Sequence, residues 1–403
     1  MQTTAGLDLA SEEHRLAVVD EQGRQLEQLR IRHDEAGITA LCRRVVELGV
    51  SRVAIERPDG LVVDRLLDAG ISVVPVHPNQ LAANRSRYSV AGGKSDGFDS
   101  YVLAELARTD MHRLRTIEPD ADETKALRAL TRSREDLVQT RVRLANQLRA
   151  ELERFWPGAA CIFSAVDSPI ALAFLERYPS PADARGLGGK RLQGFLSRNG
   201  YCGRRSADEL LERLRSAPQG RAGEAEQEAR RSVVLALVAA LKPLVEQIKL
   251  LTSQIAGALR AHDDGTIFLS LFRDPKSVVT AAELLAEIGD CRDRYPSAEA
   301  LAADAGMAPV AVESGKRKVA CFRWACDKRL RNACATLADS SRHHHPWAHD
   351  VYQRARARGH DHPHAIRILG RAWLRVIWRI WQNGQPYNPA HHGNLNRLLT
   401  AQG

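Results

Sequence analysis

Residues 92–104, with the sequence GGKSDGFDSYVLA, combine a glycine-rich turn with two aspartates three positions apart, Asp96 and Asp99. An apolar helical pattern follows. Positions i and i+3 share a face of a helix, so both carboxylates are expected to point the same way. The ordinary explanation is a solvated first turn, where acids complement the helix dipole. Two more acids upstream raise the alternative of a metal site.

The segments before residues 92–104 alternate between strand and helix patterns. Three strand candidates come first, and helices and strands then alternate; the ranges, in chain order, are strands 3–9, 15–20 and 25–32, helix 35–48, strand 53–56, helix 61–69 and strand 71–76. This order predicts an RNase H-like (RuvC-like) α/β domain over residues 1–115.

Asp8 and Glu56 stand at the ends of two of these strands. In an RNase H-like sheet the two strands are neighbours, and the helix that carries Asp96 and Asp99 can lie across them. Carboxylate oxygens are the hard donors that Mg²⁺ or Mn²⁺ prefers. Two such ions can clamp the attacking and leaving oxygens of a phosphodiester. Taken singly, Asp8 is equally well a strand-end turn residue and Glu56 a surface acid. The four together predict a metal site.

The middle of the chain, residues 116–265, is predicted to be helical and coiled-coil-like. Apolar residues repeat at heptad spacing in 122–155 and, more regularly, in 226–260. The two segments can pair as a hairpin within one chain or as a dimer between chains. Residues 157–222 contain helix breakers and basic residues and are expected to form a small helical insertion. Its basic residues suit either a nucleic-acid backbone or a solvated surface.

The last part, residues 266–403, is expected to be mainly helical and strongly basic. Ser314 is placed in a loop and is followed by Gly315 and the cations Lys316, Arg317 and Lys318. It is either an ordinary turn serine or a nucleophile whose developing charge these cations stabilise. Between residues 316 and 379 there are 15 lysines and arginines against four aspartates.

This basic segment predicts phosphate contacts. Arg367, Arg371 and Arg375 recur every four residues on one helix, with tryptophans between them, although tryptophans at helical spacing are more typical of a core. The expected nucleic-acid contacts are Lys316, Arg317, Lys318, Arg323, Lys328, Arg367, Arg371 and Arg375. Histidines crowd between 343 and 364 near Cys321, Cys326 and Cys334, but their spacing matches no standard zinc site.

Composition agrees with a nucleic-acid partner. The 403-residue chain carries a formal net charge of +9 and is 44% hydrophobic, which is enough for packed cores. Its seven cysteines form no CxxC pair, which indicates a reduced compartment. No signal-peptide pattern and no long apolar run is present, so a cytoplasmic protein without a membrane partner is expected.

The chain resembles a known family, the bacterial insertion-sequence transposases. These proteins join an N-terminal RuvC-like DEDD domain to a C-terminal serine transposase domain and are related to the Piv invertases. The matching motifs are Gly6-Leu7-Asp8, Ala54-Ile55-Glu56, Lys94-Ser95-Asp96 with Asp99, residues 284–290 (LLAEIGD), residues 301–309 and Ser314-Gly315-Lys316. Three features depart from the family pattern: residues 273–277 (RDPKS) in place of a glycine-rich hairpin, Arg57 after Glu56, and the long insertion at residues 157–222.

The resemblance implies a site-specific recombinase guided by a bridge RNA that pairs with donor and target DNA. It also implies Mg²⁺ at the four acids, Ser314 as a nucleophile linked covalently to DNA, and dimers that assemble into tetramers in the bacterial cytoplasm, at the nucleoid. Two other functions remain open. One is an RNase H-like endonuclease or Holliday junction resolvase that uses metal-activated water. The other is a binding protein that keeps the acids without catalysis.

Overall fold

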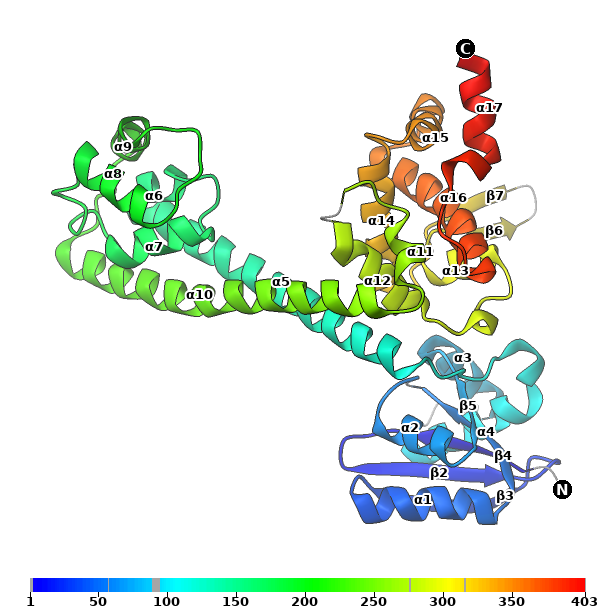
Figure 1. Ribbon diagram of the computed structural model, residues 1–403. Coiled ribbons are helices and arrows are strands. Elements are labelled where there is room, and N and C mark those ends of the chain that lie inside the picture. Colours follow the sequence, from blue (N-terminus) through cyan, green and yellow to red (C-terminus); the bar gives the residue numbers. More distant parts are fainter. Residues whose placement is uncertain (1–2, 57, 89–94, 275–276, 315–316, 403) are drawn as a thin grey trace. The chain divides into compact units, whose positions relative to one another are not determined.

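The computed structural model describes residues 3–56, 58–88, 95–274, 277–314 and 317–402 (Figure 1). The chain divides into two compact units, Met1–Pro119 and Asp120–Gly403. The expected division into 1–115, 116–265 and 266–403 is finer than these two units and stays a prediction. In the described ranges, no helix is both long and apolar enough to cross a bilayer.

The first unit is built on a five-stranded sheet with the strand order β3-β2-β1-β4-β5. Strand β2 runs antiparallel to β1 and β3, whereas β4 runs parallel to β1 and β5. The mixed α/β architecture is confirmed, and the strand order fits the expected RNase H-like domain. The strands are β1 (Thr3–Asp8), β2 (Glu13–Val19), β3 (Gln25–Arg32), β4 (Val50–Ile55) and β5 (Ser72–Pro75).

Helices cover both faces of this sheet. On one face, α1 (Glu35–Glu47) and α2 (Leu61–Asp68) pack on the strand residues that include Leu7 and Ile55. On the other face, α3 (Pro78–Tyr88) and α4 (Asp96–Thr109) share a smaller core that includes Ala54. Successive strand residues point to opposite faces. The side chains next to Leu7 and Ile55 along β1 and β4 therefore belong to the α4 face.

Gly6 lets α4 lie directly on β1. A Cβ atom at Gly6 would fall 2.1 Å from the carbonyl oxygen of Ser100 and 2.4 Å from the amide nitrogen of Ala104. Any larger residue would push the helix off the strand. The start of α4 is set by Ser95, whose side chain caps the helix by accepting a hydrogen bond from the amide of Phe98.

The second unit contains a long antiparallel helical hairpin of α5 (Asp122–Phe155) and α10 (Glu224–Ala261), seen in green and cyan in Figure 1. The heptad seam of α10 packs on α5 of the same chain, which is one of the two pairings that the sequence allowed. The buried α10 residues are Val234, Leu237, Val238, Leu241, Ile248, Ile255 and Leu259.

The expected helical insertion lies at the far end of this hairpin and has a core continuous with it. Its helices are α6 (Pro157–Cys161), α7 (Pro169–Arg177), α8 (Gly189–Arg198) and α9 (Ala207–Ser216). The opposite end of the hairpin joins the C-terminal part through a second core. Ion pairs cross this junction, including Arg132 on α5 with the buried Glu287 on α12 (Val278–Ile288) at 2.7 Å.

The C-terminal part is mainly helical and surrounds α16 (His362–Asn383). Asp361 caps the start of α16, and Gly384 ends it in a left-handed conformation with φ of +64°. Trp373 and Trp381 of α16 are fully buried, so these tryptophans belong to the core. The other elements are α11 (Gly265–Leu269), α12 (Val278–Ile288), α13 (Ala298–Asp304), β6 (Val310–Ser314), β7 (Arg317–Cys321), α14 (Lys328–Ser341), α15 (Pro346–Ala357) and α17 (Gly393–Gln402). Single 3-10 turns occur at Met111–Arg113, Arg292–Arg294 and Pro389–His391.

Candidate active site

Two acidic residues lie side by side at the carboxyl ends of β1 and β4. Asp8 is the last residue of β1, and Glu56 directly follows β4. The parallel pairing aligns Leu7 with Ile55, so Asp8 and Glu56 are the next position along each strand. Because Leu7 and Ile55 face α1 and α2, alternation directs Asp8 and Glu56 toward the face covered by α4.

Helix α4 adds a third carboxylate to this face. Asp99 lies in the first turn of α4, and its side chain is only 5% exposed. The close packing at Gly6 brings this turn down onto the end of β1. A buried carboxylate requires compensation by hydrogen bonds or an opposite charge.

Arg85 of α3 supplies that compensation. Its Nε donates to Oδ1 of Asp99 at 2.6 Å, and one terminal nitrogen donates to Oδ2 at 2.8 Å. This hydrogen bonding raises the pKa of Arg85 against the effect of burial, and the negative charges of Asp99, Glu56 and Asp8 raise it further. The negative charges of all three carboxylates therefore stabilise the charged form of the Arg85 guanidinium. We define Asp8, Glu56 and Asp99 as the acid cluster; Arg85 contacts Asp99 directly, and the charges of Glu56 and Asp8 act on it electrostatically.

Asp96 has a different environment from Asp99. It is exposed and lines a shallow hollow of about 650 Å³ beside β2 and β3. Residues three positions apart on a helix differ by about 60° in direction around the helix axis. This difference is enough for Asp99 to face the sheet while Asp96 lies at the exposed edge of the helix. The shared orientation expected for the two aspartates is therefore not seen. The hollow is lined by Arg15, Gln25, Gln28, Arg30, Ser95, Asp96, Gly97, Phe98 and Tyr101.

The acid cluster fits a hard divalent cation in its donors. All its side-chain donors are carboxylate oxygens, the type that Mg²⁺ and Mn²⁺ prefer. In this structure the positive charge beside the cluster is the guanidinium of Arg85, which donates hydrogen bonds to both carboxylate oxygens of Asp99. Within the described ranges, no three histidine, cysteine or acidic side chains are grouped closely enough to hold a metal ion. Arg85 uses one lone pair on each oxygen of Asp99, so it would compete with a metal for this carboxylate.

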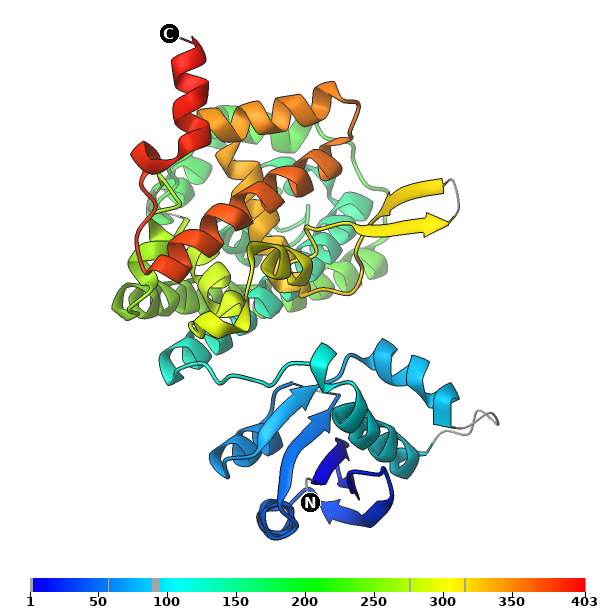
Figure 2. The same cartoon turned by 90° about the vertical axis from the view of Figure 1, so that its right-hand side faces the viewer.

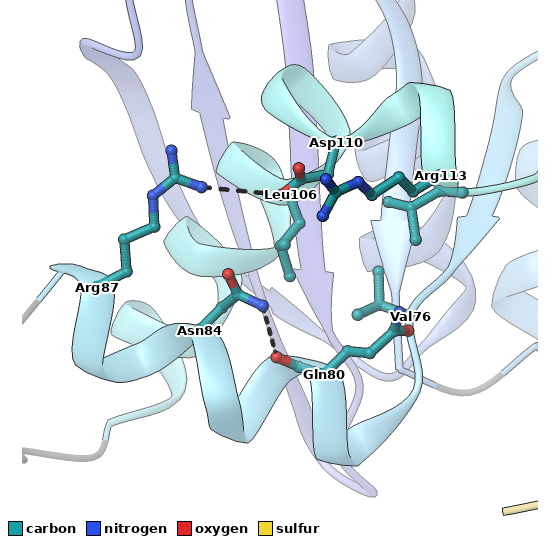
Figure 3. A pocket seen from close by; sticks show the side chains of 8 residues that line it. Val76, Gln80, Asn84, Arg87, Leu106, Asp110 and Arg113 are labelled. Atoms are coloured by element: carbon teal, nitrogen blue, oxygen red, sulfur yellow. Dashed lines mark hydrogen bonds and ion pairs between the residues drawn. The ribbon is translucent and has the colours of Figure 1, made fainter. Parts of the chain in front are cut away.

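A small pocket lies on another stripe of α3 (Figure 3). Gln80, Asn84 and Arg87 line it from α3, and Arg87 approaches the carboxylate of Asp110 to 3.8 Å. Its volume of about 200 Å³ is below the range of typical ligand pockets, roughly 300–1,000 Å³. We assign it no ligand.

Ser314 ends a strand of the second unit. It is the last residue of β6 and is paired in register with Arg317 of β7, where an irregular loop was expected. The antiparallel pairing of β6 with β7 extends to Ser314, which accounts for the difference. Lys316 lies outside the described residues. Figure 2 shows the two yellow strands extending away from the helices of this unit.

The expected nucleic-acid-binding residues have different surroundings. Arg323 donates from Nε to the carbonyl of Ala308 at 3.2 Å, and Lys328 is exposed at the start of α14. On α16, Arg367 stacks over the ring of Phe322. Further along α16, Arg371 is half-buried and Arg375 forms an exposed ion pair with Glu299 at 3.3 Å. The backbones of Arg317 and Lys318 lie in β7.

Arg85 was missed by the sequence analysis. It stands 14 residues before Asp99, at the end of a weakly amphipathic helix, and no spacing rule connects the two. The only available signal was a cation in a helix that precedes a proposed acid cluster, which is too common to single out one arginine.

Comparisons with known proteins identify two family regions in the chain, one in each half. A family model described as transposase matches residues 5–157, and a model described as the transposase IS116/IS110/IS902 family matches residues 277–353. The mini-circle putative transposase for IS117 of Streptomyces coelicolor is 33% identical over 395 residues, which cover 95% of this chain and 94% of that protein.

This chain belongs to the IS110/IS116 family of transposases. A 44.8 kDa protein of insertion element IS116 from Streptomyces clavuligerus is 30% identical, with 96% of each chain covered. RuvC of T. thermophilus in complex with a Holliday junction substrate covers 29% of this chain and 100% of that chain, at 18% identity and a TM-score of 0.23. That score is too low to support an argument. As an IS110-family transposase, the protein cleaves and transfers DNA strands.

Proposed function

We propose that this IS110-family transposase is a site-specific recombinase guided by a bridge RNA, with a Mg²⁺-binding DEDD site and Ser314 as its nucleophile. The observation that supports the DEDD site is that Asp8 and Glu56 follow paired positions at the carboxyl ends of β1 and β4, on the face where Arg85 holds Asp99. Asp96, at the rim of α4, is the proposed fourth ligand.

Asp8, Glu56, Asp96 and Asp99 would hold Mg²⁺ or Mn²⁺. When bound, the metal supplies charge stabilisation for the oxygens of the reacting phosphodiester. The chain's own contribution is a set of carboxylates held in place by the β1–β4 pairing and by α4. Arg85 would compete with the metal for Asp99. When it gives up these hydrogen bonds, its guanidinium has free donors, which suit a phosphate oxygen.

Ser314 is proposed to conserve the energy of the cleaved phosphodiester bond in a covalent link to DNA. Its Oγ attacks phosphorus and loses its proton, and the departing nucleotide oxygen takes up a proton and leaves as a hydroxyl. The result is a phosphoserine ester between protein and DNA. Attack by the hydroxyl of another strand reverses these bond changes and joins the new strand. Water attack would lose this energy.

The proposed partners are double-stranded donor and target DNA, a structured guide RNA, and further copies of the chain as a dimer that assembles into a tetramer. The net charge of +9 and the cations of the C-terminal part support polyanionic partners. An RNase H-like endonuclease or Holliday junction resolvase that uses metal-activated water remains the second candidate, favoured by the acid cluster alone.

The nucleophile is tested by incubating the protein with Mg²⁺, guide RNA and donor and target DNA, and then looking for a denaturant-resistant protein–DNA adduct. Ser314→Ala should form no adduct. Ser232→Ala, a serine-to-alanine change on the exposed side of α10, is the matched control and should form it. If Ser314→Ala still cleaves and rejoins DNA, the serine is a bystander and the resolvase mechanism takes its place.

The metal site is tested separately by Mn²⁺ titration followed by electron paramagnetic resonance. Asp8→Asn should weaken Mn²⁺ binding because a ligand is lost. Arg85→Gln should strengthen it because the competing cation is removed. Arg87→Gln, which changes the arginine that approaches Asp110 instead, should leave it unaltered. Equal Mn²⁺ affinity in the Arg85 and Arg87 variants would contradict the competition.

A further inference from the structure

Trp324 is the most exposed large apolar side chain among the described residues. Its side chain is 78% exposed, whereas Trp347, Trp373 and Trp381 in the same unit are 4% exposed or less. Isolated apolar residues on a surface are common, but an indole is large and its exposure is costly. The surroundings of Trp324 indicate what this exposure serves.

The segment that carries Trp324 is fixed on both sides. Before it, Arg323 is bonded to the carbonyl of Ala308 at 3.2 Å. After it, the amide of Asp327 donates to the carbonyl of Asp304 at 2.8 Å, and the Asp327 carboxylate caps α14. Trp324 therefore projects from an anchored turn. Because the backbone on both sides is already ordered, a ligand that binds Trp324 does not have to order it.

Cations surround the aromatic neighbour of Trp324. The ring of Phe322 meets the indole edge-on, with centroids 4.7 Å apart at 76°. The guanidinium carbons of Arg331 and Arg367 each lie 5.0 Å from the centre of the Phe322 ring. Throughout the part of the chain that the structure describes, neither arginine forms an ion pair with a carboxylate. Their positive charge is available to an anionic ligand.

We propose that Trp324 is a stacking platform for one unpaired base of a DNA strand, with Arg331 and Arg367 contacting the neighbouring phosphates. An exposed aromatic ring among cations is the chemistry that binds single-stranded nucleic acid, because every base offers a π-face and every linkage a negative charge. A base inside a duplex has both faces covered by its neighbours, so only an unpaired base can stack on the indole.

DNA is the expected source of this base because the family cleaves and transfers DNA strands, and transfer requires strands to leave their duplex. Strand β7 connects the two sites. Phe322 lies five residues beyond Arg317, the register partner of Ser314, which corresponds to about 17 Å along a strand. The placement relative to a cut phosphate rests on the proposed role of Ser314, whereas the stacking does not.

The test is the affinity of the full chain in the Ser314→Ala background for a mixed-sequence single-stranded DNA 20-mer and for the same sequence as a duplex. Trp324→Ala should weaken single-strand binding by about 5- to 100-fold and leave duplex binding nearly unchanged, since stacking on an aromatic ring contributes by this amount per base. Trp324→Phe should retain part of the affinity. Val319→Ala, which removes exposed apolar surface from the preceding strand β7 without removing a ring, is the control.

Arg331→Gln and Arg367→Gln should each reduce the salt dependence of single-strand binding by about one phosphate contact. Unchanged single-strand affinity in Trp324→Ala would overturn the proposal. So would a loss confined to an RNA 20-mer, or a loss of self-association without a loss of DNA affinity. Because no cleavage is needed, failure of the adduct experiment would leave this result standing.

Discussion

Lowering the pH from 7 to 5 is expected to act in opposite directions on the stability contributions of two half-buried groups of the second unit. His345 packs against Trp347, Trp373 and Tyr387, and burial, with the nearby His392 and His344, lowers its pKa to about 4. Glu283 on α12 is half-buried, with Arg134 and Glu135 of α5 among its charged neighbours. This burial raises the pKa of Glu283 to about 7, although the positive charge of Arg134 opposes the shift.

The sign follows from which state binds more protons. For His345 the unfolded pKa of 6.5 is above the folded value, so the unfolded state takes up a proton first as the pH is lowered. The free energy of unfolding therefore decreases as the pH is lowered. Between pH 7 and 5 this loss is about 2 kcal/mol. For Glu283 the folded pKa is above the unfolded 4.5, so the folded state is protonated first and stability rises by about 2 kcal/mol over the same interval. The two contributions nearly cancel in the natural protein.

Single substitutions should reveal each contribution. His345→Phe keeps an aromatic ring among the tryptophans but cannot titrate, so its stability relative to the natural protein should rise by about 2 kcal/mol between pH 7 and 5. The stability of Glu283→Gln relative to the natural protein should fall by a similar amount over the same pH interval. Urea unfolding followed by tryptophan fluorescence at both pH values measures the difference, and five of the six tryptophans lie between residues 324 and 381.

His349→Gln is the matched control, since His349 is exposed. It should follow the pH dependence of the natural protein. If His345→Phe follows it too, the half-buried imidazole does not have the lowered pKa, and the reasoning from its burial is wrong.

Two further predictions concern packing. Leu241→Asp combined with Ile248→Asp should unfold the α5–α10 hairpin, because each charge would enter a dry seam at a cost of several kcal/mol, whereas Leu250→Asp, at a site 52% exposed, should change stability by less than about 1 kcal/mol; circular dichroism with temperature measures both. Gly6→Ala should destabilise the first unit by about 2 kcal/mol or more because its Cβ meets the backbone of α4, while Gly257→Ala, in open space on α10, should stabilise the chain by up to about 1 kcal/mol, and hydrogen exchange in β1 and α10 separates the two effects. A Gly6→Ala protein with unchanged protection in β1 and α4 would contradict the close approach.

The sequence by itself determined features that depend on neighbours along the chain. Short stretches of small or apolar residues marked β1 and β4 and placed Asp8 and Glu56 at their ends, because such runs need only the local sequence to be read. The heptads of residues 226–260 marked a long helix with one buried stripe for the same reason. The family motifs agreed with both, and the comparisons confirmed the transposase family.

Only the tertiary structure decided which residues meet. The heptad pattern was equally compatible with a partner chain, and the connection through α6–α9 is what returns α10 onto α5. Asp96 and Asp99 looked equivalent in the sequence, yet the approach of α4 at Gly6 buries one and leaves the other at the rim. Arg85 reaches Asp99 only because α3 and α4 pack on the same face of the sheet. Such contacts depend on the path of the whole chain, so no local period records them.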